Sequence, residues 1–334
     1  MLTKQMKKFF HYFDMINVNV VRGVGSMNIL VVGAGAVGGY FGGRLHEKGE
    51  DVTFLVRQKR KQQLERNGLK IESVHGDVVF KPKLITIDDE RKTFDVVFIG
   101  TKAYHLEDAI RAVKPFTHDE TIIIPMLNGI AHIERLQQVF SKEQVIGGVC
   151  FIESTVTETG VIRQTSRMHH FLFGELSGER SERIVKLEEM FLNTKAVFKA
   201  TDSIERELWN KYMFITTMSG VTTLFRQPIG PILELDEGVK VIKGLIDEIT
   251  MIMRAEGAPL SADVKEDQYS RFLKLEYSMK SSMQRDMEKN APIEADHLQG
   301  YLLKKANKHG IACPLLTTVY ANLKIRSEEH TSEL

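Results

Sequence analysis

The glycine-rich segment between residues 33 and 38 constrains the fold more than any other part of the sequence. It reads GAGAVG, which is the GxGxxG spacing, and it follows Asn28–Val32, an apolar run typical of a strand buried on both faces. The first glycine permits the tight turn, the second lets the backbone approach a pyrophosphate, and the third lets helix and strand pack closely. Free N–H groups at the helix N-terminus favour an anion there. We therefore predict a dinucleotide site formed by Gly33, Ala34, Gly35, Ala36, Val37 and Gly38. A purely structural glycine turn is the alternative.

Strand-like and helical segments alternate as far as about residue 200, with helical patterns such as Ala131–Phe140 between the strands. This alternation predicts an α/β Rossmann-type doubly wound parallel sheet with right-handed crossovers. The expected strands after the first are Asp51–Val56, Phe94–Ile99, Thr121–Ile124 and Val145–Ile152, with added strands at Val161–Gln164, His170–Gly174 and Ala196–Lys199.

Beyond about Asp202 the strand-like runs stop and long helical patterns begin, which predicts an all-α C-terminal domain. The expected helices are Ile204–Leu224, Gly238–Ala255, Ala262–Met287 and Ala295–Lys308. We expect a dinucleotide-binding domain over residues 27–200 and a helical substrate and dimerisation domain over residues 201–325. Residues 1–26 are expected to be an extension upstream of Met27. Residues 326–334 (RSEEHTSEL) resemble a translated sequencing adapter and are expected to be an artefactual tail.

Composition excludes several classes of function. The formal net charge is +1, so the overall charge favours neither nucleic acid nor an anionic membrane. No apolar run approaches the roughly 20 residues that a membrane-spanning helix needs. Cys150 and Cys313 fit no disulfide or metal spacing, and His169-His170 fits no metal spacing either. We therefore expect no metal, two buried thiols and a cytoplasmic protein.

The end of the second expected strand bears on the choice of cofactor. NAD enzymes usually place Asp or Glu there to bind the ribose 2′-hydroxyl. This strand ends at Arg57, and the residues that follow contain no acid before Glu65. A guanidinium group suits the 2′-phosphate of NADP(H) through a forked, charge-assisted pair. We predict NADP(H) with Arg57 as its principal contact, and a solvated basic helix start is the alternative.

Polar residues at two strand ends and on one helix are candidates for the chemistry. Lys102 and Asn128 each follow an expected strand at its carboxyl end, where open α/β sheets bind ligands. A surface lysine and a turn asparagine are the alternatives. Lys211, Ile215 and Ser219 are spaced four apart and share one face of an otherwise apolar helix. A lysine facing a closed cleft loses hydration, which lowers its pKa and makes proton donation feasible; a solvated lysine is the alternative.

A third cluster contains Ser282 and, beyond Pro292, Glu294 and Asp296. Glu294 stands near an expected helix start, where carboxylates are stabilised. Helix capping by Glu294 or Asp296 is therefore the alternative to a role in a site.

Six segments in order resemble the ketopantoate reductase (2-dehydropantoate 2-reductase) family over about residues 27–325. They are ILVVGAGAVGGYFGGRL, TKAYHLEDAI, the Asn128-Gly129 turn, ERELWNKY, SSMQRDM and IEADHLQGYLLKKANKHGIACP. The resemblance implies reduction of 2-dehydropantoate to pantoate, a precursor of pantothenate and coenzyme A, by an enzyme that is often a dimer.

The resemblance also implies a role for each matched residue. Lys211 matches the general acid that protonates the carbonyl oxygen as hydride arrives at C2. Glu294 matches the acidic residue that orients the reacting groups, and Ser282 matches a serine that binds substrate. Lys102 and Asn128 would lie along the cofactor and nicotinamide side of the cleft.

One departure from the family pattern concerns the substrate. The best-known members carry asparagines one and two turns after the lysine, where this chain has Ile215 and Ser219. Another small 2-oxo acid is therefore an alternative substrate. A non-catalytic NADP(H)-binding redox sensor and an oxidative hydroxyacid or phosphogluconate-type dehydrogenase are further alternatives. The sensor would not need Lys211, Ser282 and Glu294, and the dehydrogenase lacks the EADHLQGYLL segment.

Overall fold

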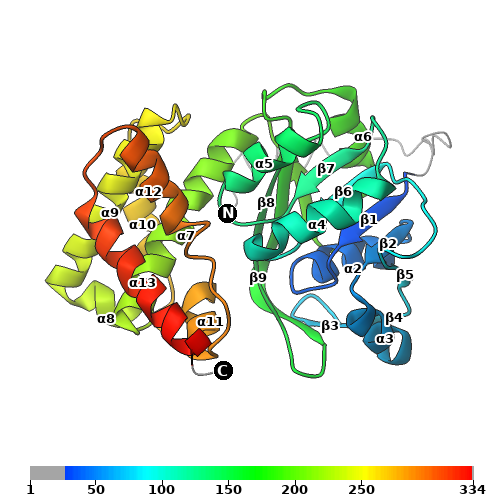
Figure 1. Cartoon of the computed structure of the whole chain (residues 1–334), viewed down its shortest axis with the longest axis horizontal. Coiled ribbons are helices and arrows are strands. Elements are labelled where there is room, and N and C mark those ends of the chain that lie inside the picture. Colours follow the sequence, from blue (N-terminus) through cyan, green and yellow to red (C-terminus); the bar gives the residue numbers. More distant parts are fainter. Residues whose placement is uncertain (1–26, 333–334) are drawn as a thin grey trace, which may run out of the picture.

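The computed structural model describes residues 27–332, which form two lobes joined by helix α7 (Figure 1). One lobe contains sheets with flanking helices, and the other contains helices alone. This arrangement confirms the predicted fold class. The extension expected at residues 1–26 lies outside the described residues.

A five-stranded parallel sheet forms the centre of the first lobe, in the order β5-β2-β1-β6-β7. Chain order reverses beside β1, so the carboxyl ends of β1 and β6 form the switch point at which open α/β sheets typically bind ligands. Four of the five strands are buried along their whole length, as their apolar runs predict. The strands are β1 (Ile29–Val32), β2 (Val52–Leu55), β5 (Lys83–Ile85), β6 (Val96–Ile99) and β7 (Ile122–Pro125).

A second sheet packs beside the first and corrects part of the expected topology. The strand expected at Val145–Ile152 is β8 (Gly147–Val156), which runs antiparallel to β9. Just before β8, Val145 forms an isolated parallel bridge with Ile123 of β7. The two short strands expected at Val161–Gln164 and His170–Gly174 are parts of one long strand, β9 (Ile162–Gly174). The other members of this sheet are β3 (Leu69–Ser73), β4 (Val78–Phe80) and β10 (Val197–Ala200). Sequence reasoning missed β3, β4 and β5.

Helices connect these strands and cover the sheets. The helix after the glycine loop is α2 (Gly38–Lys48), and it ends at Gly49, which adopts φ +110°. The remaining helical segments of this lobe are α3 (Gln58–Asn67), η1 (Ala103–His105), α4 (Leu106–Val113), η2 (Lys114–Phe116), α5 (Ala131–Val139) and α6 (Glu182–Phe191).

The second lobe is a bundle around α7 and α9. The prediction of one helix over Ala262–Met287 is wrong, because α10 ends at Phe272 and α11 begins at Ser282. The last predicted helix begins at Gln299 rather than Ala295, which leaves Glu294 in the preceding segment. The helices are α7 (Ile204–Phe225), α8 (Ile229–Glu234), α9 (Asp236–Ala255), α10 (Val264–Phe272), α11 (Ser282–Glu288), α12 (Gln299–Lys308) and α13 (Pro314–Ser332).

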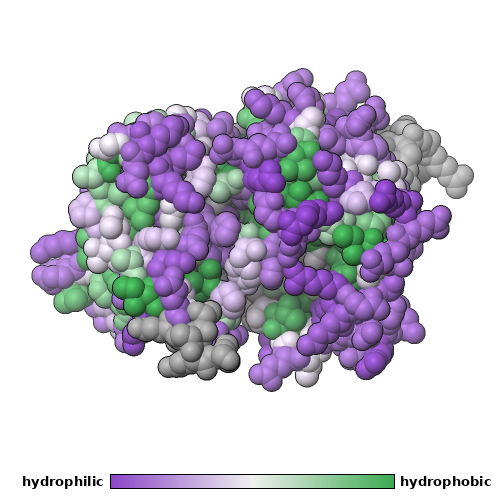
Figure 2. All heavy atoms as spheres, in the orientation of Figure 1, coloured by the Kyte–Doolittle hydropathy of each residue, from purple (hydrophilic) through white to green (hydrophobic). Residues whose placement is uncertain are grey.

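An apolar cluster anchors α7 to the first lobe. Ile204 and Leu208 at the start of α7 pack with Val149 of β8 and Ile133 of α5, and all four are buried. Figure 2 shows a mainly hydrophilic surface over both lobes, with separate hydrophobic patches. Both cysteines are buried free thiols, as expected. Within residues 27–332, no helix is both long and apolar enough to cross a membrane.

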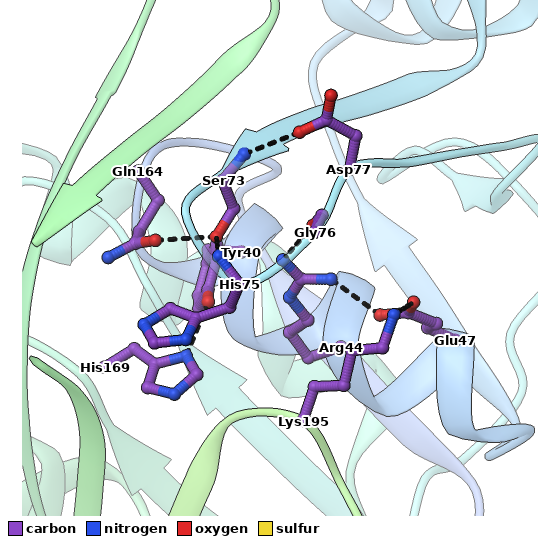
Figure 3. A network of polar contacts seen from close by, with 10 residues as sticks. All are labelled: Tyr40, Arg44, Glu47, Ser73, His75, Gly76, Asp77, Gln164, His169 and Lys195. Carbon is purple, nitrogen blue, oxygen red and sulfur yellow. Dashed lines mark hydrogen bonds and ion pairs between the residues drawn. The ribbon is translucent and has the colours of Figure 1, made fainter. Parts of the chain in front are cut away.

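A polar network fastens the β3–β4 turn to α2 and β9 (Figure 3). Arg44 of α2 is fully buried, donates to the Gly76 carbonyl over 2.6 Å and pairs with Glu47 over 2.7 Å. The rings of His75 and His169 stack with centroids 3.5 Å apart, and His169 Nδ1 shares a 2.7 Å hydrogen bond with the Tyr40 hydroxyl. A proton added to His169 would therefore lie close to a buried cation.

This network should make the protein lose stability in acid. Burial, together with the charges of His75, Arg44 and His170, lowers the pKa of His169 to about 4. In the unfolded chain this histidine has a pKa of about 6.5, so the unfolded state binds the proton at a higher pH than the folded state does. The contribution of His169 to the free energy of unfolding is therefore complete above pH 6.5 and is lost as the pH falls toward 4. We expect a lower urea midpoint at pH 5 than at pH 7, and a smaller difference in H169Q.

The H118Q variant, which removes a histidine outside this network, is the matched control and should keep the parent's pH dependence. His132 should retain part of the acid sensitivity in both variants, because burial lowers its pKa to about 3. An H169Q protein with the parent's full difference between pH 5 and pH 7 would show that His169 is not responsible.

Candidate active site

The glycine loop has the geometry that its spacing predicts. Gly33 adopts φ +95°, which disfavours any residue with a side chain. A Cβ at Gly38 would lie 2.5 Å from the Gly33 carbonyl oxygen, so this glycine allows the close packing of helix and loop. A Cβ at Gly35 would have no heavy atom within 4 Å, so the second glycine faces open space. The loop therefore fits a dinucleotide pyrophosphate beside Gly35.

Arg57 lies at the carboxyl end of β2, immediately before α3, and 69% of its side chain is exposed. Its guanidinium contacts Asp108 Oδ2 over 3.2 Å and His105 Nδ1 over 3.4 Å. An exposed ion pair of this kind contributes little free energy, so the guanidinium can exchange partners at small cost. The position is compatible with the predicted contact to a 2′-phosphate.

Lys102 connects the two lobes. Its Nζ lies 2.7 Å from Asp286 Oδ2 of α11 and 3.6 Å from Glu294 Oε2. Burial alone would lower the pKa of Lys102, but the negative charges of Glu294 and Asp286 outweigh burial and raise it. Lys102 is therefore a cation on the first lobe held by two carboxylates of the second. Sequence reasoning missed Asp286, because the pairing joins residues far apart in the chain.

Glu294 is buried, and its Oε1 accepts a 2.8 Å hydrogen bond from the backbone N–H of Ala103. This bond reaches from the segment before α12 to the first residue of η1, directly after Lys102. The partners of Glu294 are therefore on the opposite lobe, which differs from the alternative of capping its own helix. Asp296 instead accepts from the Tyr320 hydroxyl and pairs with Lys324.

Lys211 lies in the third turn of α7, close to the junction of the lobes. It is partly buried, and its Nζ is 5.7 Å from the centre of the Phe151 ring of β8. Burial lowers the pKa of Lys211, against the opposing effects of Cys150 and Glu294. Within residues 27–332 the ammonium group makes no hydrogen bond or ion pair. Such a lysine gives up its proton more readily than a solvated one.

The Asn128-Gly129 turn rests against the helical lobe. Gly129 adopts φ +86°, and a Cβ there would lie 3.3 Å from Leu298 and 3.5 Å from the His297 carbonyl oxygen. Asn128 is partly buried beside it. The same carboxyl edge of the sheet thus brings the turn close to the segment that contains Glu294.

The remaining predicted residues lie on α7 and α11. Ser282 is exposed at the first position of α11, while the neighbouring Ser281 caps that helix. Ile215 is partly buried and packs against the helical core. Ser219 is buried, and its hydroxyl accepts a 2.9 Å hydrogen bond from Gln299 Nε2. Ser219 therefore already has a partner inside the helical lobe.

His132 is a residue near the site that sequence reasoning did not identify. It lies in the first turn of α5, is 3% exposed, and its Nε2 is buried without a hydrogen-bond partner in the described part of the chain. After burial itself, the charges of Lys211 and His297 contribute to its lowered pKa. No motif in a single sequence distinguishes it from the other ten histidines.

Comparison with known proteins identifies one family whose models match both lobes. The family model "Ketopantoate reductase PanE/ApbA" matches residues 29–178, and the model of its C-terminal domain matches residues 203–327. The chain is 51% identical to the uncharacterized oxidoreductase YkpB of Bacillus subtilis, over 91% of this chain and 100% of that protein.

Solved structures share the whole fold. A 2-dehydropantoate 2-reductase from Geobacter metallireducens superposes with a TM-score of 0.81 and 28% identity, over 89% of this chain and 99% of that one. A D-mandelate dehydrogenase with NADH and anilino(oxo)acetate superposes with a TM-score of 0.83, over 91% and 100% of the two chains. Its identity of 20% makes this a likeness of fold alone. Two matched domain models and a half-identical relative along the whole length place this chain in the ketopantoate reductase family of oxidoreductases.

Proposed function

We propose that this oxidoreductase reduces 2-dehydropantoate to pantoate with NADPH and uses Lys211 as its general acid. One observation carries the proposal: Lys211 lies at the junction of the lobes with a desolvated ammonium group and no ion-pair partner among the described residues. A structural lysine whose ammonium group has lost part of its hydration normally has a paired carboxylate. A lysine that must release and regain a proton benefits from having no paired carboxylate, because such a partner would stabilise the charged form.

The family's cofactors are nicotinamide dinucleotides, and the residues present fit one. Gly33, Gly35 and Gly38 would hold the pyrophosphate, Arg57 the 2′-phosphate, and Lys102 and Asn128 the nicotinamide side of the cleft. When bound, the reduced nicotinamide supplies the hydride that the substrate carbon requires.

The chain's own residues supply the proton and the orientation. Lys211 donates its proton to the carbonyl oxygen as negative charge develops there, which stabilises the alkoxide and completes the alcohol. Glu294, fixed by the Ala103 N–H, would orient the reacting groups, and Ser282 would bind the substrate. The apolar contact between α7 and β8 would help to limit the access of water. A cytoplasmic location and a homodimer remain predictions.

A second candidate substrate is favoured by Ile215 and Ser219. Ile215 has no polar group, and the Ser219 hydroxyl is bound by Gln299. Neither side chain replaces the amides that the resemblance leads us to expect for recognition of a substrate hydroxyl. Reduction of a small 2-oxo acid without that hydroxyl is therefore the second candidate.

Removing the Lys211 ammonium should reduce turnover without weakening cofactor binding. We expect K211M to lower kcat by on the order of 10²–10⁴, the usual contribution of general acid catalysis. NADPH oxidation with 2-dehydropantoate measures this, and NADPH titration checks binding. K240M, on the exposed side of α9, is the control. A K211M enzyme within about threefold of the parent would remove Lys211 from the role.

Arg57 should discriminate between the two cofactors. We expect the parent to bind NADPH more tightly than NADH, and R57M to raise the Kd for NADPH by roughly tenfold or more, because charge-assisted hydrogen bonds to the 2′-phosphate are lost. The Kd for NADH should stay the same. R111M removes the neighbouring exposed partner of Asp108 and is the control. Equal affinity of the parent for both cofactors would contradict the assignment.

The I215N variant should separate the two substrate candidates. The test compares kcat/KM for 2-dehydropantoate with kcat/KM for 3,3-dimethyl-2-oxobutanoate, which differs only by lacking the hydroxyl. An amide that binds the hydroxyl should shift this ratio toward 2-dehydropantoate by about tenfold. An unchanged ratio would mean that Ile215 does not face the substrate. No turnover of any 2-oxo acid by a parent that binds NADPH tightly would favour the redox sensor.

A further inference from the structure

Two side chains from outside the glycine loop bind its carbonyl oxygens. Arg60 of α3 donates from Nη2 to the Ala34 carbonyl over 3.0 Å. Ser154 of β8 donates from its hydroxyl to the Ala36 carbonyl, also over 3.0 Å. These partners are 26 and 118 residues away along the chain, so local backbone geometry does not account for them.

The same arginine also holds the tip of the β8–β9 hairpin. Its Nη2 donates to the Gly160 carbonyl over 3.2 Å, and its Nη1 donates to Gln63 Oε1 over 2.6 Å. Gln63 in turn donates to the Thr159 carbonyl over 3.2 Å. Gly160 adopts φ +86°, and a Cβ there would lie 2.7 Å from Arg60 Nη1. The guanidinium is thus enclosed between the hairpin and the glycine loop.

Fixing the two carbonyls also fixes the N–H groups on the other side of the same peptide planes. A trans peptide is planar, so its C=O and N–H point in opposite directions. The N–H groups opposite the held carbonyls belong to Gly35 and Val37. In the part of the chain that the structure describes, neither of these N–H groups donates a hydrogen bond. Gly35 is also the glycine that faces open space.

We propose that Arg60 and Ser154 are positioning residues that preorganise the glycine loop for a pyrophosphate. By binding the Ala34 and Ala36 carbonyls from outside, they keep the Gly35 and Val37 N–H groups turned toward the ligand. The pyrophosphate would then meet two N–H donors that are already oriented, so binding would cost little conformational entropy in the loop. The inference rests on the dinucleotide site of the proposed function. It assigns Arg60 a task different from that of Arg57, three residues earlier.

The dinucleotide pair NADPH and NADH provides the test, because both carry the pyrophosphate and only one carries the 2′-phosphate. We expect R60M and S154A each to raise the Kd for NADPH and for NADH by the same factor, about tenfold for R60M. The kcat at saturating NADPH should stay close to the parent's. R60K should resemble R60M, because the guanidinium binds the Ala34 and Gly160 carbonyls through Nη2 and Gln63 through Nη1, and one ammonium group cannot reproduce this planar, two-nitrogen arrangement.

Matched controls are K59M and T155A, which alter exposed neighbours on the same two elements. Both should bind the two cofactors as the parent does. Melting of each variant without cofactor checks folding, and S154A provides the test if R60M does not fold. A rise in Kd for NADPH alone would make Arg60 a 2′-phosphate ligand and overturn the proposal, as would unchanged affinities in R60M and S154A. Because the readout is binding, failure to reduce 2-dehydropantoate would count against the proposed function and leave this test intact.

Discussion

The hydrogen bond from the Ala103 N–H to Glu294 is the contact on which the rest of the candidate site depends. A buried carboxylate is costly unless donors surround it, and here both donors come from the other lobe, as the Ala103 N–H and the more distant Lys102 ammonium. The lobes therefore cannot separate without leaving Glu294 unpaired. Their closure in turn desolvates Lys211, whose lowered pKa suits it to donate a proton. The contact between the lobes thus accounts both for the pairing of Glu294 and for the lowered pKa of Lys211.

The backbone around the glycine loop brings the proposed cofactor-binding edge of the sheet close to this contact. A Cβ at Gly100, at the end of β6, would lie 2.8 Å from the Gly38 Cα, so the strand end and the start of α2 pack backbone to backbone. From Gly100 the chain continues through Thr101 directly to Lys102 and Ala103. The segment that packs against the glycine loop therefore also binds Glu294, and the loop and the helical lobe are positioned by one short piece of chain.

Sequence patterns predicted the elements that local periodicity determines and missed those that distant contacts determine. The glycine spacing and the apolar runs placed β1, α2, β2, β6 and β7 correctly. The break between α10 and α11 escaped prediction because it contains neither Gly nor Pro; instead, the carbonyls of Tyr277 and Met279 accept the N–H groups of Gly230 and Ile229. Asp286, Arg60 and His132 were missed for the same reason, since each has partners or charged neighbours far along the chain.

In the proposed function, the helix face that begins with Lys211 would link substrate choice to acid strength. Ser219, two turns on, is bound by Gln299 inside the bundle, so under the proposed function Ile215 is the remaining position on this face that would meet a substrate. Ile215 also neighbours Lys211 along the helix, four residues away. An amide at this position would offer the ammonium group a polar neighbour and oppose the desolvation that lowers its pKa. Under the proposed function, an apolar residue at 215 would therefore favour both a less polar substrate and a stronger acid, so the two properties would not be independent.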